Sequence, residues 1–550
     1  MTATPSPLAG LTWPQLLSRH SFIELDALGR ATALLDPGTG RVLVGPFDRL
    51  ESPWLEPQGI TPQSDDGTVL VKGTVDGHAV VVAAIEQGFQ GGGTGEVSGA
   101  KISQALLLAA ADSRAGRPTA GVILFETGGV RLQEANLGLN AVAESCWAAL
   151  DLRQLAPVIG IVAGTVGSFG GMSIAAGLCT RLIVTPQARI GLNGPAVIEQ
   201  EGGVDEFDSS DHELIWAIDG GERRFAAGLA DALVPDDTQM LRGELITAVR
   251  SGVAEQGRHR SERLDMLAAR ITDHAPARAP DAAAAPDSRG RIWLRRLSGD
   301  DSPAEFIPSV LSATTATARY LAVVPDPDNP FHRARNGEVG LTESLALARA
   351  VLDVVDADDD AAVKRAIVAV VDLPSQAYGR IEETVGLHQA MAAAVNAYHT
   401  ARNAGHPIVA LVVGTALSGG LLTHGLQANQ ILALDDPGVE IHAMHKAAAA
   451  RITLRTVEEL DALGAKIAPM SYEVSDWATL GFCDGLLTVE DADNPTDRDI
   501  ATVSAAIADA VQRARNGPSD LSNRLDSEAA KSTRRASRAV REVLARQWNS

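Results

Sequence analysis

Two stretches of this chain repeat nearly the same pattern and divide the sequence into related halves. Residues 157–171 and 407–420 each contain an apolar run rich in Val and Ile, then Gly-Thr, then a turn of small residues that ends in Gly-Gly. Thr165 and Thr415 occupy matching positions 250 residues apart. This order is typical of a buried strand that ends in a glycine turn opening a helix. Such a turn exposes backbone N–H groups at a helix N-terminus, so the repeat predicts two lobes, each with a loop that stabilises negative charge.

The segments around each repeat alternate between strand and helix. The predicted strands are 67–86 (a pair), 121–126, 157–164, 365–374 and 407–414, and the predicted helices are 135–154, 384–405 and one beginning in 420–430. Nearly continuous apolar strands separated by helices are typical of a largely parallel sheet covered on both faces. We therefore expect an α/β fold of two lobes, each with a β-sheet core flanked by helices.

A stretch without periodicity separates the two halves. Residues 274–288 consist mainly of Ala, Pro and Asp, a composition typical of a linker. We expect one domain over 1–273 and a second over 289–550. From residue 520 onward the sequence is polar, and we expect a polar helix or a frayed tail.

The overall charge excludes some partners. A formal net charge of −22 argues against nucleic acid, which needs clustered Lys and Arg. An acidic partner would need a local basic patch, and two basic runs, 258–270 and 531–546, are candidates. Each is equally typical of a solvated helix face. If one of them docks an acidic partner, we expect it to be the C-terminal run.

The remaining composition predicts a cytoplasmic protein. Cys146, Cys179 and Cys483 are scattered and form neither a disulfide framework nor a metal-binding pair, so we expect no bound metal. No apolar run approaches the roughly 20 residues that a membrane span needs. The first residues carry neither a basic nor an apolar segment, so we expect no signal peptide.

The glycine turns suggest oxyanion chemistry. Gly128 and Gly129 follow the predicted strand 121–126, and Gly170 and Gly171 follow the next one. Two N–H donors aimed at a thioester oxygen would stabilise an enolate. The alternative is a tight turn without a ligand. The glycine-dense segment 89–101 lacks the dinucleotide-binding and Walker patterns, so we do not expect a nucleotide there.

At these loops the chain resembles a known family. Residues 89–101, 125–135 and 164–200 look like the β-type carboxyltransferase subunit of acyl-CoA carboxylases, and more closely the β subunit of biotin-independent malonate decarboxylase. Residues 21–37 and 44–55 fit that β subunit in particular, and the second half, from about residue 290, resembles the γ subunit. The chain therefore looks like a β–γ fusion, without the zinc-ribbon cysteines often found on bacterial carboxyltransferases of the β type. The resemblance implies a crotonase-like fold in each lobe.

The resemblance also implies a reaction. Malonyl-S-acyl carrier protein would lose CO2 and become acetyl-S-acyl carrier protein. The carrier arm would be a phosphoribosyl-dephospho-CoA group on a separate small subunit, and a separate α subunit would exchange acetyl for malonate. No biotin and no tightly bound cofactor are expected.

Several side chains are candidates for the site. We expect Gly128, Gly129, Gly170 and Gly171 to hold the enolate oxygen and Gly419 and Gly420 to orient the departing carboxylate. The candidate proton donors are His424, His442 and Tyr378, without a ranking among them. The candidate substrate-binding residues are Arg131, Lys101, Gly92, Gly93 and His445. Arg131 has an alternative role as an ion-pair partner of Glu134, and Lys101 as a solvated surface residue.

Other functions remain open at this point. A biotin-dependent carboxyltransferase uses the same fold and loops but moves the carboxyl group to biotin. A non-catalytic scaffold that docks carrier and transferase subunits belongs to a different class. An enoyl-CoA hydratase is less favoured, because the two loops carry no paired Glu residues placed to handle water. Whether one chain or two form the site also stays open.

Overall fold

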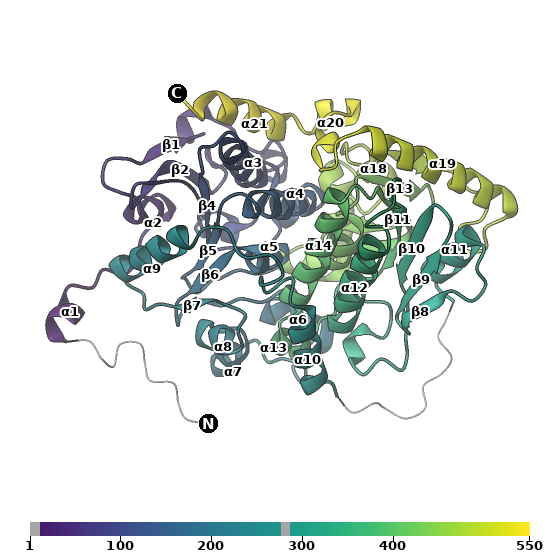
Figure 1. The fold of residues 1–550 in the computed structure, drawn as a ribbon, viewed down its shortest axis with the longest axis horizontal. Coiled ribbons are helices and arrows are strands. Elements are labelled where there is room, and N and C mark those ends of the chain that lie inside the picture. Colours follow the sequence, from purple (N-terminus) through teal and green to yellow (C-terminus); the bar gives the residue numbers. More distant parts are fainter. Residues whose placement is uncertain (1–11, 277–286) are drawn as a thin grey trace.

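Each half of the chain builds its own β-sheet. The computed structural model describes residues 12–276 and 287–550 (Figure 1). The first sheet has seven strands in chain order, and the second has eight, in the order β15-β13-β12-β11-β10-β9-β8 with β14 on β12. The strands of the first sheet are β1 (Arg41–Leu43), β2 (Thr68–Val75), β3 (His78–Ile85), β4 (Ala120–Phe125), β5 (Val158–Val162), β6 (Arg181–Val184) and β7 (Ala232–Leu233). Those of the second are β8 (Ala304–Ile307), β9 (Val310–Thr314), β10 (Ala318–Val323), β11 (Ala366–Leu373), β12 (Ile408–Leu417), β13 (Gln430–Leu434), β14 (Ile441–His442) and β15 (Gly485–Leu487).

The two sheets share one topology. Each begins with three antiparallel strands, β1–β3 and β8–β10, and continues with parallel strands. In the first sheet a tight turn joins β2 to β3, where Asp76 and Gly77 take φ values of 51° and 78°, the left-handed pair that a two-residue hairpin turn requires. The parallel strands are buried, as their continuous apolar sequences predict. The predicted two-lobed α/β fold is confirmed, whereas the domain limits stay a prediction because residues 277–286 of the expected linker lie outside the described residues.

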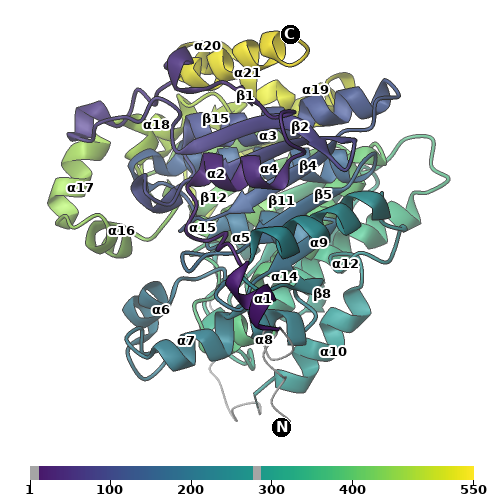
Figure 2. The ribbon, with the colours of Figure 1, turned by 90° about the vertical axis from the view of Figure 1, so that its left-hand side faces the viewer.

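Helices cover both faces of each sheet. On the first sheet, α2 and α9 lie over one face (Figure 2), and α3 and α4 pack on the other. The helices of the first half are α1 (Trp13–Leu17), α2 (Ala27–Leu34), α3 (Glu96–Arg114), α4 (Ala135–Arg153), α5 (Gly171–Leu178), α6 (Pro195–Gly202), α7 (His212–Asp219), α8 (Gly221–Ala226), α9 (Thr238–Ser251) and α10 (Leu264–His274). Those of the second half are α11 (Arg289–Ser298), α12 (Leu341–Ala357), α13 (Arg380–Val385), α14 (Leu387–Asn403), α15 (Ser418–Gly420), α16 (Lys446–Ile452), α17 (Val457–Gly464), α18 (Val474–Ala478), α19 (Asp497–Asn516), α20 (Glu528–Thr533) and α21 (Arg535–Gln547). Among the residues that the structure describes, no helix is both long enough and apolar enough to cross a bilayer.

The lobes meet through the helices that follow the glycine turns. Helices α4 and α5 of the first lobe contact α14, and α4 also contacts η6, a π-helical turn over Leu421–Gly425. Every residue of α4 except Asp151 is buried, because the helix is covered by its own sheet on one side and by the second lobe on the other. A Cβ added at Gly171 would lie 2.8 Å from Leu422 Cδ2. The Gly-Gly turns of the two halves therefore lie at one shared interface.

Two predicted helices differ from the structure in length. The predicted helix 384–405 divides at Gly386, whose φ of 98° ends α13 and starts α14. The helix expected from Gly420 is only the short α15 and the turn η6. It stops there because the chain must reverse within a few residues to enter β13, which pairs with β12.

The C-terminal segment is not a frayed tail. Helix α21 crosses back onto the first lobe and packs on α3 (Figure 1). Its Arg541 and the preceding Arg534 each place an Nη2 atom 2.7 Å from the carboxylate of Glu144 on α4. Both arginines are buried. Arg534 and Arg541 therefore do not belong to a free basic surface, because they pair with an internal carboxylate, whereas Lys531, Arg535 and Arg546 of the same run are exposed.

Candidate functional site

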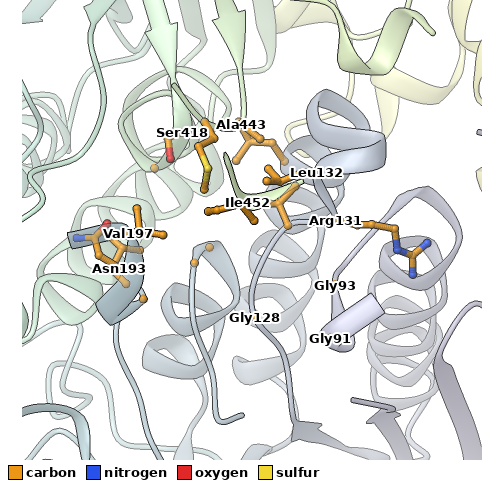
Figure 3. Close-up of a pocket in the computed structure, with 18 of the residues that line it drawn as sticks. Gly91, Gly93, Gly128, Arg131, Leu132, Asn193, Val197, Ser418, Ala443 and Ile452 are labelled. Atoms are coloured by element: carbon orange, nitrogen blue, oxygen red, sulfur yellow. The ribbon is translucent and has the colours of Figure 1, made fainter. Parts of the chain in front are cut away.

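A pocket of about 350 Å³ lies between the two lobes (Figure 3). The loops that follow β4, β5, β11 and β12 all reach it, as parallel strands that end at the same edge of a sheet would predict. No acidic side chain of the described residues lines it, although the chain as a whole is strongly acidic. The lining includes Gly93, Gly128, Val130, Gly170, Gly171, Asn193, Gln376, Tyr378, Ser418, Gly419, Ala443 and Met444.

The first-lobe loops are held by a buried carboxylate and by close backbone contact. Glu126, directly after β4, accepts hydrogen bonds from the amides of Val166 and Gly167 at 2.8 and 3.1 Å, and its other oxygen pairs with Arg30 at 2.9 Å. The two Gly-Gly turns touch, since a Cβ added at Gly129 would lie 3.2 Å from Gly170 Cα. Only glycine permits this approach.

Four of the expected backbone donors are already used inside the protein. The amide of Gly128 donates to the Gly91 carbonyl at 3.0 Å, that of Gly129 to Thr127 Oγ1 at 3.0 Å, that of Gly170 to the Leu192 carbonyl at 2.9 Å and that of Gly419 to Gln376 Oε1 at 2.8 Å. This corrects the expected set of oxyanion donors. These glycines shape the turns, whereas their N–H groups are not available to a ligand.

Two other amides in the first lobe are available. In the described ranges, no hydrogen bond involves the N–H of Val130 or of Gly171, and both residues line the pocket. Gly171 is the first residue of α5, so its N–H belongs to the positive end of that helix. A Cβ added at the neighbouring Gly170 would lie 3.7 Å from the Val130 nitrogen, so the two amides lie close together. They form a pair of free donors at the wall of the pocket, and of the two only Gly171 was expected from the sequence.

The other candidate glycines lie at different depths. Gly93 lines the pocket, whereas Gly92 is buried behind it, where an added Cβ would lie 2.0 Å from the Glu126 carbonyl oxygen. Gly420 packs against the second-lobe loop, because a Cβ there would lie 2.8 Å from the Ser375 carbonyl oxygen. Gly92 and Gly420 therefore support the loops from behind.

Tyr378 is the one candidate proton donor that the structure brings to the pocket among the described residues. It is only 6% exposed. Burial raises the pKa of Tyr378, and the nearby Ser418 side chain offsets this only in part. Its hydroxyl therefore stays protonated at neutral pH. Ser418 takes a φ of 57°, an uncommon conformation for a residue with a side chain, at the turn from β12 into α15.

The histidines do not reach the pocket. His424 lies in η6 and shares a hydrogen bond of 2.8 Å with Tyr398, and burial lowers its pKa to about 4. His442 stacks on Tyr472 with ring centroids 3.9 Å apart, and burial lowers its pKa to about 3. Both rings are therefore neutral at pH 7. His445 precedes α16 without lining the pocket.

The two basic candidates are engaged elsewhere. Arg131 donates from Nη1 to Asp66 and to Glu134, both at 2.7 Å, and its guanidinium points away from the pocket (Figure 3). The alternative role, an ion pair with Glu134, is the one that the structure shows. Lys101 is buried, donates to the Asp65 carbonyl at 2.9 Å and lines a separate cavity beside β1 and α2. Within the ranges described, no group of three or more His, Cys, Asp or Glu side chains is arranged to hold a metal.

Comparison with known proteins assigns the two halves. The family description "Carboxyl transferase domain" matches residues 45–270, and "Malonate decarboxylase gamma subunit" matches residues 334–548. A relative from Malonomonas rubra, malonyl-S-ACP:biotin-protein carboxyltransferase MADC, is 39% identical over 247 residues, which are 43% of this chain and 77% of that protein. The chain belongs to the malonate decarboxylase family.

A second relative and a solved structure each match part of this chain. The M. rubra protein MADD is 40% identical over 130 residues, 23% of this chain and 44% of that protein. The chain thus spans less than half the length of this second relative. A chain of the Pseudomonas malonate decarboxylase hetero-tetramer in complex with malonate is 54% identical, with 49% of this chain and 96% of that chain covered and a TM-score of 0.47. In this family member the β-type and γ-type halves are joined in one chain.

Sequence reasoning missed Val130, Gln376 and Asn193 as residues of the site. The contribution of Val130 is a backbone N–H, which leaves no trace in the identity of its side chain. Gln376 corresponds to Val130 in the repeat, since Val130 bridges Thr94 in parallel and Gln376 bridges Val339 in the same way. The two residues lie 246 positions apart, so the 250-residue spacing of the Gly-Thr repeat does not reveal this correspondence.

Proposed function

We propose that this chain decarboxylates a malonyl thioester and releases CO2 without passing it to an acceptor. The proposal is supported most by one observation, the free amide pair of Val130 and Gly171 in an interlobe pocket without acidic side chains. The printed names of the relatives add malonyl-S-ACP as the carboxyl donor.

The chemistry requires a sink for one electron pair. When the bond between the α-carbon and the carboxylate breaks, CO2 leaves and the electrons move onto the thioester oxygen as an enolate. The amides of Val130 and Gly171 stabilise this oxygen, and a donor of this kind lowers the activation free energy by about 3–4 kcal/mol. The α-carbon then takes the proton of the Tyr378 hydroxyl, and solvent returns a proton to the tyrosinate. The product is the acetyl thioester.

The wider assembly follows from the same function. The acyl group arrives on the phosphoribosyl-dephospho-CoA arm of a small carrier subunit, and an α subunit exchanges acetyl for malonate. Among the described residues that line the pocket, the one cation is Arg131, whose guanidinium points away from the pocket and is neutralised by Asp66 and Glu134. Neutral donors therefore recognise the acyl group on the arm.

A carboxyltransferase to biotin is the second candidate. It is favoured by the relatives MADC and MADD, whose names print a biotin protein as the partner. The two functions differ in what happens to the carboxyl carbon.

The test is the fate of labelled carbon. The purified chain is incubated with malonyl-CoA labelled at the free carboxyl, with and without avidin and with and without a biotinylated carrier domain. We expect labelled CO2 in every case and no dependence on avidin. Release that requires the biotin domain would establish the transferase. Inactivity of the chain together with activity of another subunit would establish a scaffold.

A further inference from the structure

The second lobe contains a counterpart of the free amide pair. In the first lobe, Thr94 donates to the Gly129 carbonyl at 2.8 Å and accepts from Arg131 at 2.9 Å, and Val130 lies between them. In the second lobe, Val339 donates to the Ser375 carbonyl at 3.0 Å and accepts from Ala377 at 3.0 Å, with Gln376 between them. The backbone N–H of Gln376 thus occupies the place of the Val130 N–H.

The other member of the pair matches as well. Gly170 and Ser418 take nearly the same φ, 59° and 57°, at the turn before the helix. The amide that follows is that of Gly171 in one lobe and of Gly419 in the other. Because Ser418 adopts a glycine-like conformation at a cost, the turn is held in this shape by its surroundings.

The two pairs differ in one respect. The amide of Gly171 is free, whereas that of Gly419 donates to Gln376 Oε1 at 2.8 Å. The side-chain oxygen of Gln376 thus occupies one donor of the second pair, the Gly419 N–H. The backbone N–H of Gln376 is the other donor of this pair. One residue therefore supplies both a donor of the site and the side-chain oxygen that occupies the site.

The first lobe locks this side chain in place. Gln376 Nε2 donates to Asn193 Oδ1 at 2.8 Å, and the Asn193 side chain donates to the Ala377 carbonyl at 2.8 Å. The backbone N–H of Asn193 in turn donates to Glu383 Oε1 at 2.8 Å. Gln376 and Asn193 are 6% and 2% exposed. All these bonds cross the lobe interface, so the position of the Gln376 amide is fixed before any ligand binds.

We infer that the side-chain amide of Gln376 is a built-in occupant of a carbonyl-binding site in the second lobe. It excludes from this site the urea or amide carbonyl of a carboxyl acceptor. A primary amide oxygen and a cyclic urea oxygen are acceptors of the same kind, so the side chain and such an acceptor compete for the same N–H groups. The inference deepens the proposed function, because a pocket with one open and one closed amide pair holds a thioester but no acceptor for its carboxyl group.

The test removes the Gln376 side chain from the second amide pair and measures the binding of a cyclic urea directly. Imidazolidin-2-one, the cyclic urea alone, is titrated into the full chain and followed by ligand-observed NMR and calorimetry. We expect Gln376→Ala to bind it roughly tenfold more tightly than the wild type, the effect of freeing about one hydrogen-bond donor. Gln376→Leu removes the same hydrogen bonds but keeps the volume filled, and we expect no gain. Acetamide should displace the cyclic urea from Gln376→Ala.

The outcomes separate this inference from the proposed function. Equal binding by the wild type and Gln376→Ala, with both variants folded by circular dichroism, would overturn the inference. So would a gain in Gln376→Leu as large as in Gln376→Ala. If the wild type releases no CO2 from malonyl-CoA while Gln376→Ala gains cyclic-urea binding, the proposed function fails and the inference stands.

Discussion

At the scale of single residues, the proposed chemistry depends on two backbone amides and the phenol of Tyr378. Tyr378 lies against Ser418 at the pocket wall, and burial holds its proton at neutral pH. The histidines, which are the usual proton donors near pH 7, lie in the packed interior with lowered pKa values. The proposed mechanism therefore uses a proton donor that does not titrate in the physiological range.

Replacing Tyr378 by Phe removes that proton without changing the ring. We expect kcat for CO2 release to fall by about 10²–10⁴-fold, the usual contribution of a positioned general acid. Tyr320→Phe on β10 is the matched control, because Tyr320 lies on a strand that contributes nothing to the pocket lining. Steady-state rates for both variants check this, and an unchanged kcat in Tyr378→Phe would assign the proton to another group.

The same assignment predicts the response to pH. Because burial raises the pKa of Tyr378 and the buried histidines are neutral, kcat should stay flat between about pH 6 and 9. A histidine donor would instead produce a break near its ordinary pKa of about 6.5. A profile of single-turnover rates against pH distinguishes the two.

The sequence predicts the location of these residues better than their roles. The Gly-Gly motifs correctly lead to the loops around the pocket, because glycine is required where Gly129 and Gly170 touch. The sequence does not reveal which amides are free, since three of the four paired glycine N–H groups donate to residues distant in sequence, namely Gly91, Leu192 and Gln376. Which hydrogen bonds form is decided by tertiary packing.

At the scale of elements, the strand-to-helix turns shape the walls of the pocket. Gly128 and Gly129 are adjacent but differ in whether a side chain can be added at their positions. Gly129 has a φ of 112°, and an added Cβ would lie 3.2 Å from Gly170 Cα, whereas Gly128 has 3.6 Å of clearance to the Gly91 carbonyl oxygen.

A pair of alanine variants tests this difference. Gly129→Ala should destabilise the chain by about 1–3 kcal/mol, because it forces a strained backbone and separates the two turns. Gly128→Ala should stay within about 1 kcal/mol of the wild type. Thermal unfolding of both variants measures the effect. Equal unfolding midpoints would show that the turns are not held in contact. Gly129 substitutions therefore do not isolate catalysis from folding.

Elements were well predicted where they are buried. Strands β4, β5, β11 and β12 were expected within a few residues, because each is a continuous apolar run. The helix after Gly420 is shorter than expected. Its apolar residues indicate that the segment is buried, but they do not indicate that the chain reverses direction there to enter β13.

At the scale of the whole molecule, the C-terminal helices join the two halves. Glu144 on α4 lies between Arg534 and Arg541, and Arg524 donates to the adjacent Asn140 at 3.0 Å. The sequence shows only a basic tail and one acidic residue almost 400 positions away, so this pairing could not be predicted from it.

Glu144→Gln should therefore destabilise the folded chain strongly. Leaving Arg534 and Arg541 buried without their carboxylate costs about 3–5 kcal/mol. Glu528→Gln is the matched control, because Glu528 pairs with Lys531 on the surface and its loss should leave stability nearly unchanged. Unfolding midpoints of the two variants provide the comparison, and similar values would contradict a structural role for Glu144.

Acid should remove the difference in stability between the wild type and Glu144→Gln. Burial alone raises the pKa of Glu144, but Arg534 and Arg541 outweigh it and lower the pKa from 4.5 to about 2. A carboxylate with a lowered pKa stabilises the folded state above its unfolded pKa and loses that contribution as the pH falls. The difference in the free energy of unfolding between the wild type and Glu144→Gln should therefore decrease as the pH falls from about 4.5 to 2.

The central claim is that the amides of Val130 and Gly171 hold the oxygen that becomes the enolate. A crystal structure of the chain with a stable malonyl-thioester analogue, in which an amide replaces the thioester, tests this most directly. We predict the analogue's amide oxygen at roughly 2.7–3.1 Å from both nitrogens, with Tyr378 facing the α-carbon. An analogue whose carboxylate occupies that amide pair, or whose carbonyl binds at Gly419 after Gln376 has moved aside, would contradict the account.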